Sequence, residues 1–191
     1  MAQNHRIILA SGSPRRRELL SGLDIRFTVD TGNSFEEIVP EGLAASKVPA
    51  YMAKGKSLGF HRPLEDDEIL LTADTVVVAD DVLMGKPHGE QQAREMLRAL
   101  SGRHHRVITA VVLRSNARTV AFTDTTYVTF SALSDQEIDY YIEHYKPFDK
   151  AGAYGIQEWI GYVGIEKITG SYFNVMGLPV HRVYRALKEN F

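Results

Sequence analysis

Hydrophobic residues along the chain follow two periods, one typical of buried strands and one typical of amphipathic helices. Continuous apolar runs predict strands at 6–10 and at 69–79. The second run is interrupted by Thr72, Asp74 and Thr75. Polar side chains inside a buried strand are costly unless something pairs with them, so this interruption is the first sign of a functional position.

Two pairs of neighbouring strands are predicted by turn residues between apolar runs. The dipeptides at 80–81 (Asp-Asp) and 115–116 (Ser-Asn) are the turn signals. The predicted pairs are 69–79 with 82–84 and 106–114 with 119–130.

Helical spacing predicts five helices, which begin near Pro14, within 43–59, at 90, at Ser134 and near Pro179. Pro49 lies inside the second, so that helix either begins near Ser46 or is kinked. The fourth begins with the capping box 134–137. Its expected buried stripe is Ile138, Tyr141, Ile142 and Tyr145, and that of the last helix is Val180, Val183, Tyr184 and Leu187. Strands and helices are mixed rather than strictly alternating, which favours an α/β fold with a mixed sheet in a single domain, 1–191.

Composition narrows the class of protein. The 191 residues contain no cysteine, which excludes disulfides, zinc–thiolate sites and a cysteine nucleophile. With 22 Lys and Arg against 24 Asp and Glu, the net charge of −2 does not fit a protein that coats polynucleotides or acidic membranes. No apolar run is long enough for a membrane span, and the start of the chain lacks a signal-peptide core, so we expect a soluble cytoplasmic protein.

The segment 11–17, Ser-Gly-Ser-Pro-Arg-Arg-Arg, follows the first strand and opens the first helix. Free N–H groups and the positive end of the helix dipole attract phosphate there. Arg15 and Arg16 add fork-shaped donors in the first turn. The alternative is a solvated arginine run on a surface helix.

Asp74, flanked by apolar strand residues, needs a partner, a metal or a proton. Strand carboxylates often hold Mg²⁺ or orient water, although pairing with a buried arginine is the structural alternative. Lys56, near a helix end, and Lys86, in a tight turn, are weaker candidates for phosphate contacts. The segments 149–157 and 170–179 contain glycines that allow a close backbone approach, but each also fits a structural loop.

Other motifs are absent or weak. The sequence has no P-loop, no dinucleotide-binding glycine motif and no G-x-S-x-G elbow. His104 and His105 are adjacent, which is not the spacing of a helical metal pair, and Trp159 is expected to pack rather than to stack on a ligand.

Taken together, these segments resemble the Maf (septum formation inhibitor) family. The motifs occur in the family's order and span nearly the whole chain. They are ASGSPRRRELL at 10–20, Ala-Asp-Thr at 73–75, Lys-Pro at 86–87, LSGRHHRVITAV at 100–111, DKAGAYGIQ at 149–157 and GSYFNVMGLP at 170–179.

The resemblance implies a nucleoside triphosphate pyrophosphatase. It implies a mixed sheet with flanking helices in two lobes around a central cleft, similar to inosine triphosphate pyrophosphatases, with Mg²⁺ or Mn²⁺ and a homodimer. Asp74 matches the family's proton acceptor, and Glu36 or Glu37 matches an acidic position that helps to hold metal. The residues matching the phosphate-binding set are Ser11, Arg15, Arg16, Lys56 and Lys86.

The family has one branch acting on dTTP and UTP and another acting on 7-methyl-GTP. Arg15, Thr75 and Gln157 match the pyrimidine branch. Gly55 stands where the family usually has an acidic residue before the helical lysine, and Gln92 stands in place of a glutamate. Two rival functions are a nucleotide-binding regulator of cell division without essential catalysis and a sugar-phosphate phosphatase.

Overall fold

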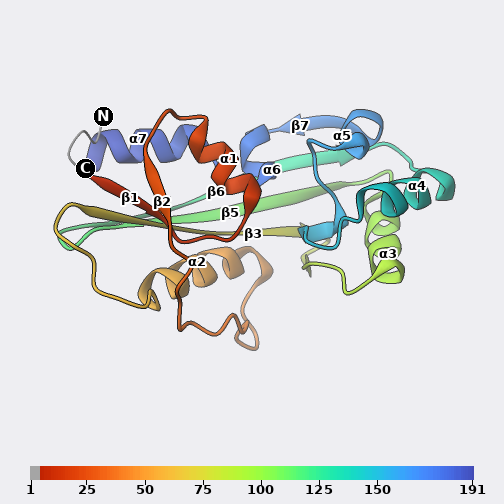
Figure 1. Cartoon of the computed structure of the whole chain (residues 1–191). Coiled ribbons are helices and arrows are strands. Elements are labelled where there is room, and N and C mark those ends of the chain that lie inside the picture. The colour runs from red at the N-terminus through yellow and green to blue at the C-terminus, as the bar shows by residue number, and fades with distance from the viewer. Residues whose placement is uncertain (1–4) are drawn as a thin grey trace. The chain divides into compact units, whose positions relative to one another are not determined.

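The computed structural model describes residues 5–191. Figure 1 shows strands and helices mixed along the chain, as the sequence predicts. The strands are β1 (Arg6–Leu9), β2 (Phe27–Val29), β3 (Glu68–Ala79), β4 (Val82–Met84), β5 (His104–Arg114), β6 (Thr119–Phe130) and β7 (Ile165–Thr169). The helices are α1 (Pro14–Ser21), α2 (Val48–Leu58), α3 (Glu90–Leu100), α4 (Asp135–Tyr145), α5 (Trp159–Gly164), α6 (Tyr172–Met176) and α7 (Val180–Asn190), with 3₁₀ turns η1 (Ala45–Lys47) and η2 (Ala151–Ala153).

The strands described form one mixed sheet in the order β2-β1-β3-β5-β6-β7, with β4 paired to β3. β1 is parallel to both neighbours, with Ile7 opposite Phe27 on β2 and Ile69 on β3. Parallel neighbours need a crossover, and α1 is the crossover between β1 and β2. The pairs β3–β4 and β6–β7 are antiparallel. The predicted fold class, an α/β fold with a mixed sheet, is therefore confirmed.

The chain divides into two compact units, and β3, β5 and β6 each contribute residues to both. Unit 1 comprises residues 1–74, 109–124 and 177–191. In Figure 1, α1 and α7 lie on one face of its strands and α2 lies on the other. Ile7, Ile8 and Leu9 of β1 are buried between these layers.

Unit 2 comprises residues 75–108 and 125–176. In it α3 packs against α4 and against η2. The capping box predicted at the start of α4 is present, since the Ser134 hydroxyl accepts from the Glu137 N–H and the Glu137 carboxylate accepts from the Ser134 N–H. The predicted turn between β3 and β4 is also present, with positive φ at Asp80 and Asp81.

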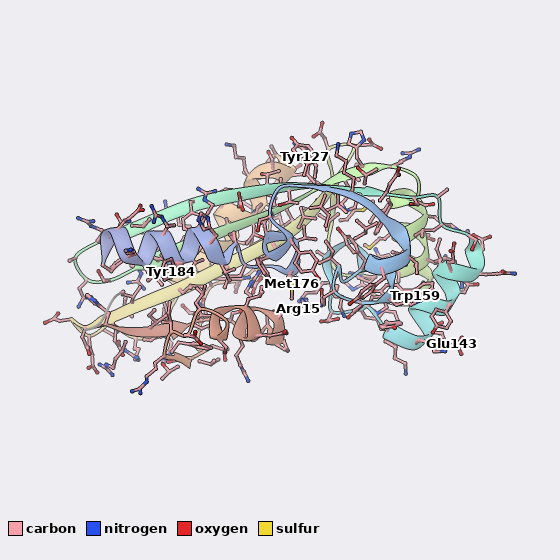
Figure 2. All side chains as sticks on the ribbon, turned by 90° about the horizontal axis from the view of Figure 1, so that it is seen from above. Arg15, Tyr127, Glu143, Trp159, Met176 and Tyr184 are labelled. Carbon is pink, nitrogen blue, oxygen red and sulfur yellow. The ribbon has the colours of Figure 1, made fainter. Side chains whose placement is uncertain are left out.

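α2 begins at Val48 after a 3₁₀ turn, so Pro49 lies in its first turn, which is the first of the two predicted alternatives, and the helix is not kinked there. Two details of the predicted buried stripes needed correction. Tyr145 is exposed rather than buried, because it lies in the last turn of α4 next to a left-handed Lys146. Tyr184, labelled on α7 in Figure 2, is only half-buried.

No helix among residues 5–191 combines the length and the apolar character needed to cross a membrane. The first four residues, which entered the expectation about a leader peptide, lie outside the described residues.

Candidate active site

The loop 11–13 and the start of α1 form as the sequence predicts. The Ser13 side chain caps the helix by accepting from the Arg16 N–H at 3.4 Å, and Pro14 takes the first helical position. The Ser13 N–H in turn donates to the Ser11 hydroxyl at 3.3 Å. The two serines thus hold the loop in one conformation ahead of the arginines, and Figure 2 labels Arg15 on this helix.

Arg16 is held from two sides. Its Nε donates to the Gly177 carbonyl at 2.9 Å, and its Nη1 lies 3.4 Å from the Ser11 hydroxyl. Burial lowers the pKa of the guanidinium, and the Asp74 carboxylate acts in the opposite direction. Gly177 comes from the motif at 170–179, so one role of that motif is to hold this arginine.

Asp74 lies on β3 and makes an ion pair with Lys56 of α2. The Lys56 Nζ is 2.8 Å from the Asp74 Oδ1, and both side chains are about one-sixth exposed (16 %). A hydrogen bond next to this ion pair holds α2 against β3: the Thr72 hydroxyl on β3 donates to the Ala53 carbonyl on α2 at 2.8 Å. Ala53 is three residues before Lys56, so this bond places the lysine one helical turn further on, beside Asp74.

The same Lys56 Nζ lies 2.8 Å from the Glu37 Oε2, so one ammonium joins two carboxylates. Burial raises the pKa of Asp74, while Lys56 and Arg16 oppose that rise and Glu37 adds to it. Asp74 is therefore a largely buried carboxylate that is paired with Lys56 and feels the charge of Arg16, and a carboxylate with a shifted pKa is a candidate for proton transfer.

Glu37 and Asp74 also suit a divalent cation. Mg²⁺ is usually bound through one or two carboxylates together with substrate phosphates and water, rather than by a full set of protein ligands. Two carboxylates that share one cationic nitrogen meet this requirement. Across residues 5–191 no cluster of three or more His, Asp or Glu side chains could hold a metal by itself. Of the two predicted glutamates, Glu37 is the one that reaches Lys56.

The remaining predicted residues lie in unit 2. Thr75 follows Asp74 on β3, Lys86 is exposed after β4, and Gln157 lies in the loop before α5. The Gly152 N–H donates to the Gly85 carbonyl at 3.1 Å, which ties the loop 149–157 to the turn that carries Lys86.

Gly152 is required at this point for two reasons. Its φ is +69°, a conformation that favours glycine, and an added Cβ would lie 3.0–3.2 Å from the Val77 side chain. Val77 is two residues beyond Thr75 on β3. The glycine therefore allows the loop to pack directly on that strand.

A buried polar network supports the residues around Gln157. The Lys150 ammonium lies 3.0 Å from the Glu158 Oε1 and 2.7 Å from the Asp149 Oδ1. Tyr141 of α4 donates a short hydrogen bond to Glu158 and accepts the Gly155 N–H at 2.9 Å. Because these contacts hold both ends of the loop, Gln157 is fixed between them. Its Oε1 is buried and has no hydrogen-bond partner within the described chain.

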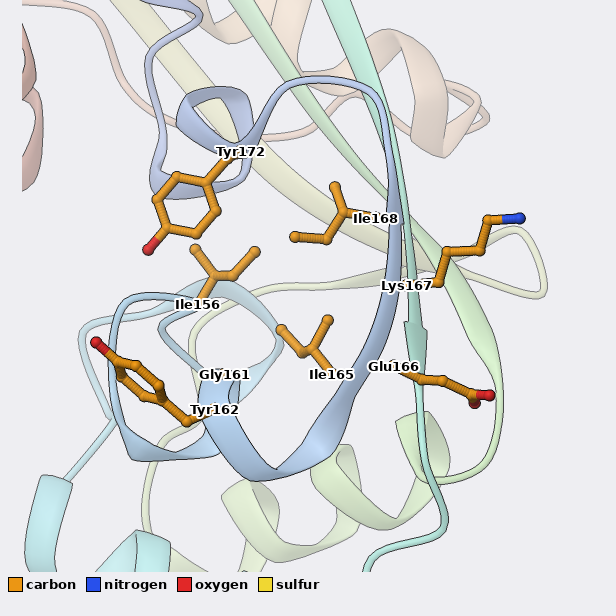
Figure 3. Close-up of a pocket in the computed structure, with 8 residues that line it drawn as sticks. All are labelled: Ile156, Gly161, Tyr162, Ile165, Glu166, Lys167, Ile168 and Tyr172. Atoms are coloured by element: carbon orange, nitrogen blue, oxygen red, sulfur yellow. The ribbon is translucent and has the colours of Figure 1, made fainter.

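A small pocket lies beside this loop in unit 2. Its volume is about 290 Å³, and Figure 3 shows Ile156, Ile165 and Ile168 facing it, with Tyr162 and Tyr172 at its sides. Trp159, labelled in Figure 2, has its ring 4.8 Å from that of Tyr140. It packs against a neighbouring ring, as the sequence predicts.

His105 has a structural role rather than a place in a metal pair with His104. It is buried, its Nε2 is 2.7 Å from the Tyr154 hydroxyl, and its ring contacts Phe130 and Tyr154. Burial lowers the pKa of His105 to about 4, so the ring is neutral near pH 7.

Within unit 1 the structure brings together Ser11, Arg16, Lys56, Asp74 and Glu37. Sequence reasoning missed the Gly177 carbonyl as the partner of Arg16, because a backbone acceptor leaves no side-chain signature. It also missed Tyr141, Lys150 and Glu158, since their association depends on the packing of α4 against the loop. The Asp-Lys at the start of the loop motif was the only visible signal.

The family model described as Maf-like protein matches residues 6–190. A dTTP/UTP pyrophosphatase of Phocaeicola vulgatus is 54% identical over 187 residues, which cover 98% of this chain and 97% of the relative. Proteins of the same name from Porphyromonas gingivalis and Parabacteroides distasonis are 50% and 48% identical, each over 98% of this chain, and the matches cover 95% and 97% of those relatives.

A solved structure of a HAM1 protein from Coxiella burnetii superimposes with a TM-score of 0.50 at 16% identity, covering 97% of this chain and 99% of the other. At that identity the likeness shows the fold alone.

Proposed function

Because the chain belongs to the Maf-like protein family, we propose that it hydrolyses dTTP and UTP to the nucleoside monophosphate and pyrophosphate. Full-length relatives named dTTP/UTP pyrophosphatase support the substrate and the reaction. The single structural observation that carries the proposal is the half-buried Asp74 beside Lys56 and Arg16. A carboxylate with a raised pKa between cations suits proton transfer next to bound phosphates.

In this reaction water attacks the α-phosphorus, the bond to the bridging oxygen between the α- and β-phosphates breaks, and pyrophosphate leaves. Asp74 accepts the proton of the attacking water. Lys56 keeps the carboxylate ionised before attack, because a neighbouring ammonium favours the charged form. Modified pyrimidine triphosphates with the same hydrogen-bonding edge are further substrates in this proposal.

The phosphates need positive charge, because a bound triphosphate brings about four negative charges into the site. Arg15, Arg16, Lys56 and Lys86 are the proposed phosphate-binding cations, and Ser11 is a hydroxyl donor. Glu37 and Asp74 would hold the Mg²⁺ or Mn²⁺ ion, and Glu36, next to Glu37 in sequence, is the other predicted acidic ligand. When bound, such an ion neutralises phosphate charge and makes water easier to ionise.

Recognition of the base is assigned to Gln157 and Thr75. Uracil and thymine present a carbonyl at O4 and an N–H at N3, and a side-chain amide offers one donor and one acceptor in the same plane. The buried Oε1 of Gln157, which has no partner among the described residues, is available to accept from N3. Thr75 is small, which leaves room beside Asp74.

The homodimer and the cytoplasmic location implied by the family are part of the same proposal. They are supported by the family assignment only. Light scattering on a size-exclusion column gives the oligomeric state directly, with a dimer as the expected result.

The proposed function is tested with a panel of dTTP, UTP, CTP, GTP and 7-methyl-GTP in the presence of Mg²⁺ or Mn²⁺, scored by pyrophosphate release. dTTP and UTP should be hydrolysed well above GTP and 7-methyl-GTP, with CTP between them or lower. A preference for 7-methyl-GTP would reject the pyrimidine assignment. Nucleotide binding without turnover would favour a regulator of cell division, and orthophosphate released from sugar phosphates would favour a phosphatase.

A further inference from the structure

Residues 33–35 are attached to the C-terminal half of α2 by a compact set of hydrogen bonds. The Asn33 amide donates to the Lys56 carbonyl at 2.5 Å, and the Phe35 N–H donates to the Asn33 Oδ1 at 2.8 Å. The Ser34 N–H donates to the Gly59 carbonyl at 2.8 Å. These bonds fix the backbone of the segment directly beside the helix that carries Lys56.

Two glycines make this close approach possible. A Cβ on Gly55 would lie 2.3 Å from the Cε2 and Cζ atoms of the Phe35 ring, so the ring occupies the space that any side chain at 55 would need. A Cβ on Gly59 would lie 2.8 Å from the Phe35 backbone nitrogen and 2.7 Å from the Asn33 Oδ1. Gly55 lies in the last turn of α2 and Gly59 is the residue that caps its end, so the two are about one turn apart. Together they form the seat of Phe35.

The seat explains how Glu37 reaches its partner. Glu37 is two residues beyond Phe35, its side chain is 60% exposed, and its Oε2 is 2.8 Å from the Lys56 Nζ. Because the Glu37 side chain of this ion pair is exposed, solvent screens the attraction and ordering the side chain costs entropy, so the pair contributes little to ordering the loop by itself. The ordering must come from the residues before Glu37, and Phe35 makes the contact that a larger residue at 55 would prevent.

We propose that Phe35, seated on Gly55 and Gly59, is a positioning residue that holds the Glu37 carboxylate against Lys56 next to Asp74. The inference rests on the proposed function, because it assigns Phe35 a task at the same site. An acidic side chain at 55 would not fit beside Phe35, because the aromatic ring occupies that space.

Thermal unfolding of four proteins tests the seat itself: the parent, Gly55→Ala, Phe35→Ala and the double variant. Alanine is favoured over glycine inside a helix, so Gly55→Ala should raise the melting temperature in the Phe35→Ala background, where no ring occupies the space. In the parent the same change should lower it, because the Cβ displaces Phe35. Gly22→Ala is the matched control, since its Cβ would make only ordinary contacts, the nearest at 3.4 Å. An increase in melting temperature from Gly55→Ala in both backgrounds would overturn the proposal.

The acetylation rate of Lys56 by acetic anhydride, followed by peptide mass spectrometry without nucleotide or metal, tests the positioning of Glu37. Gly55→Ala should raise this rate several-fold over the parent and over Gly22→Ala. Glu37→Gln should raise it similarly, and the double variant should show no further increase. Two results would mean that the seat does not act through Glu37. One is a double variant whose acetylation rate rises by the product of the two single effects, and the other is an unchanged rate in Gly55→Ala.

The parent, Gly55→Ala, Glu37→Gln and the double variant are also compared by their kcat/KM for dTTP. Gly55→Ala should lower kcat/KM in the parent but not in the Glu37→Gln background. If Gly55→Ala lowers kcat/KM by the same factor in both backgrounds, Phe35 has a structural role and does not act through Glu37. An inactive parent would instead reject the proposed function, and the acetylation and unfolding data would still decide on the seat.

Discussion

At the scale of single residues, the proposed chemistry depends on Asp74, whose ionisation is opposed by burial and favoured by the charges of Lys56 and Arg16. Asp74→Asn keeps the shape and removes the negative charge. The rate of hydrolysis should fall about 10²–10⁴-fold, which is typical for the loss of a general base. Nucleotide binding measured without divalent metal should persist or tighten, because a negative charge facing the phosphates is gone. Single-turnover kinetics and calorimetry measure the two quantities, and a near-normal kcat in the variant would reject the assignment.

The pH dependence of kcat/KM should report the ionisation of the Asp74 carboxyl group. Asp74 must be ionised to accept a proton, and burial raises its pKa, so kcat/KM should fall on the acid side at a pH above the usual range of an aspartate. Lys56 lowers this pKa by charge and by its hydrogen bond. Lys56→Gln should therefore move the acid limb to higher pH, in addition to lowering the rate. An unmoved limb in Lys56→Gln would mean that another group controls it.

Selectivity for the pyrimidine base is the role proposed for Gln157, whose buried Oε1 has no hydrogen-bond partner among the described residues. Gln157→Ala should lower kcat/KM for dTTP and UTP and change the rates of poor substrates little, because only the pyrimidines use the amide. Steady-state kinetics on the same panel of nucleotides measures the ratio. If all nucleotides slow equally, Gln157 supports the loop and does not read the base.

At the scale of elements, the packing of β5 and β6 with the loop after α4 places His105 among rings, 5.4 Å from both Phe130 and Tyr154. Burial holds its pKa at about 4, below the 6.5 of an exposed histidine. Between those values the unfolded chain binds more protons, so stability is lost as the pH falls. The loss should be about 1 kcal/mol at pH 5.5. Urea unfolding at pH 7.5 and 5.5 should show a smaller loss in His105→Gln, and an equal loss would place the acid sensitivity elsewhere.

Much of the element structure could be predicted from the sequence, because the signals were local. Ser13 and Pro14 marked the start of α1, and Ser134 with Glu137 marked that of α4. The start of α2 was harder, since Pro49 allows either a first turn or a kink and only packing decides. The exposure of Tyr145 depends on where the helix ends, which periodicity does not specify.

At the scale of the whole molecule, the residue types of the site could be predicted, but their partners could not. The pairing of Lys56 with both Glu37 and Asp74 joins three segments that are distant in sequence. Phe35 gave no sequence signal, because its importance arises only from the missing side chain at Gly55. Only the resemblance to a family, carried by motifs in one order along the chain, predicted that these separate segments act together.

In the proposed reaction, water attacks the α-phosphorus of a pyrimidine triphosphate. The most direct measurement is hydrolysis of dTTP in water enriched in ¹⁸O, with the products analysed by mass spectrometry. Attack at the α-phosphorus should give equal amounts of dTMP and pyrophosphate, with one ¹⁸O atom in the dTMP phosphate and none in the pyrophosphate. Label in the pyrophosphate, or dTDP and orthophosphate as the first products, would contradict it.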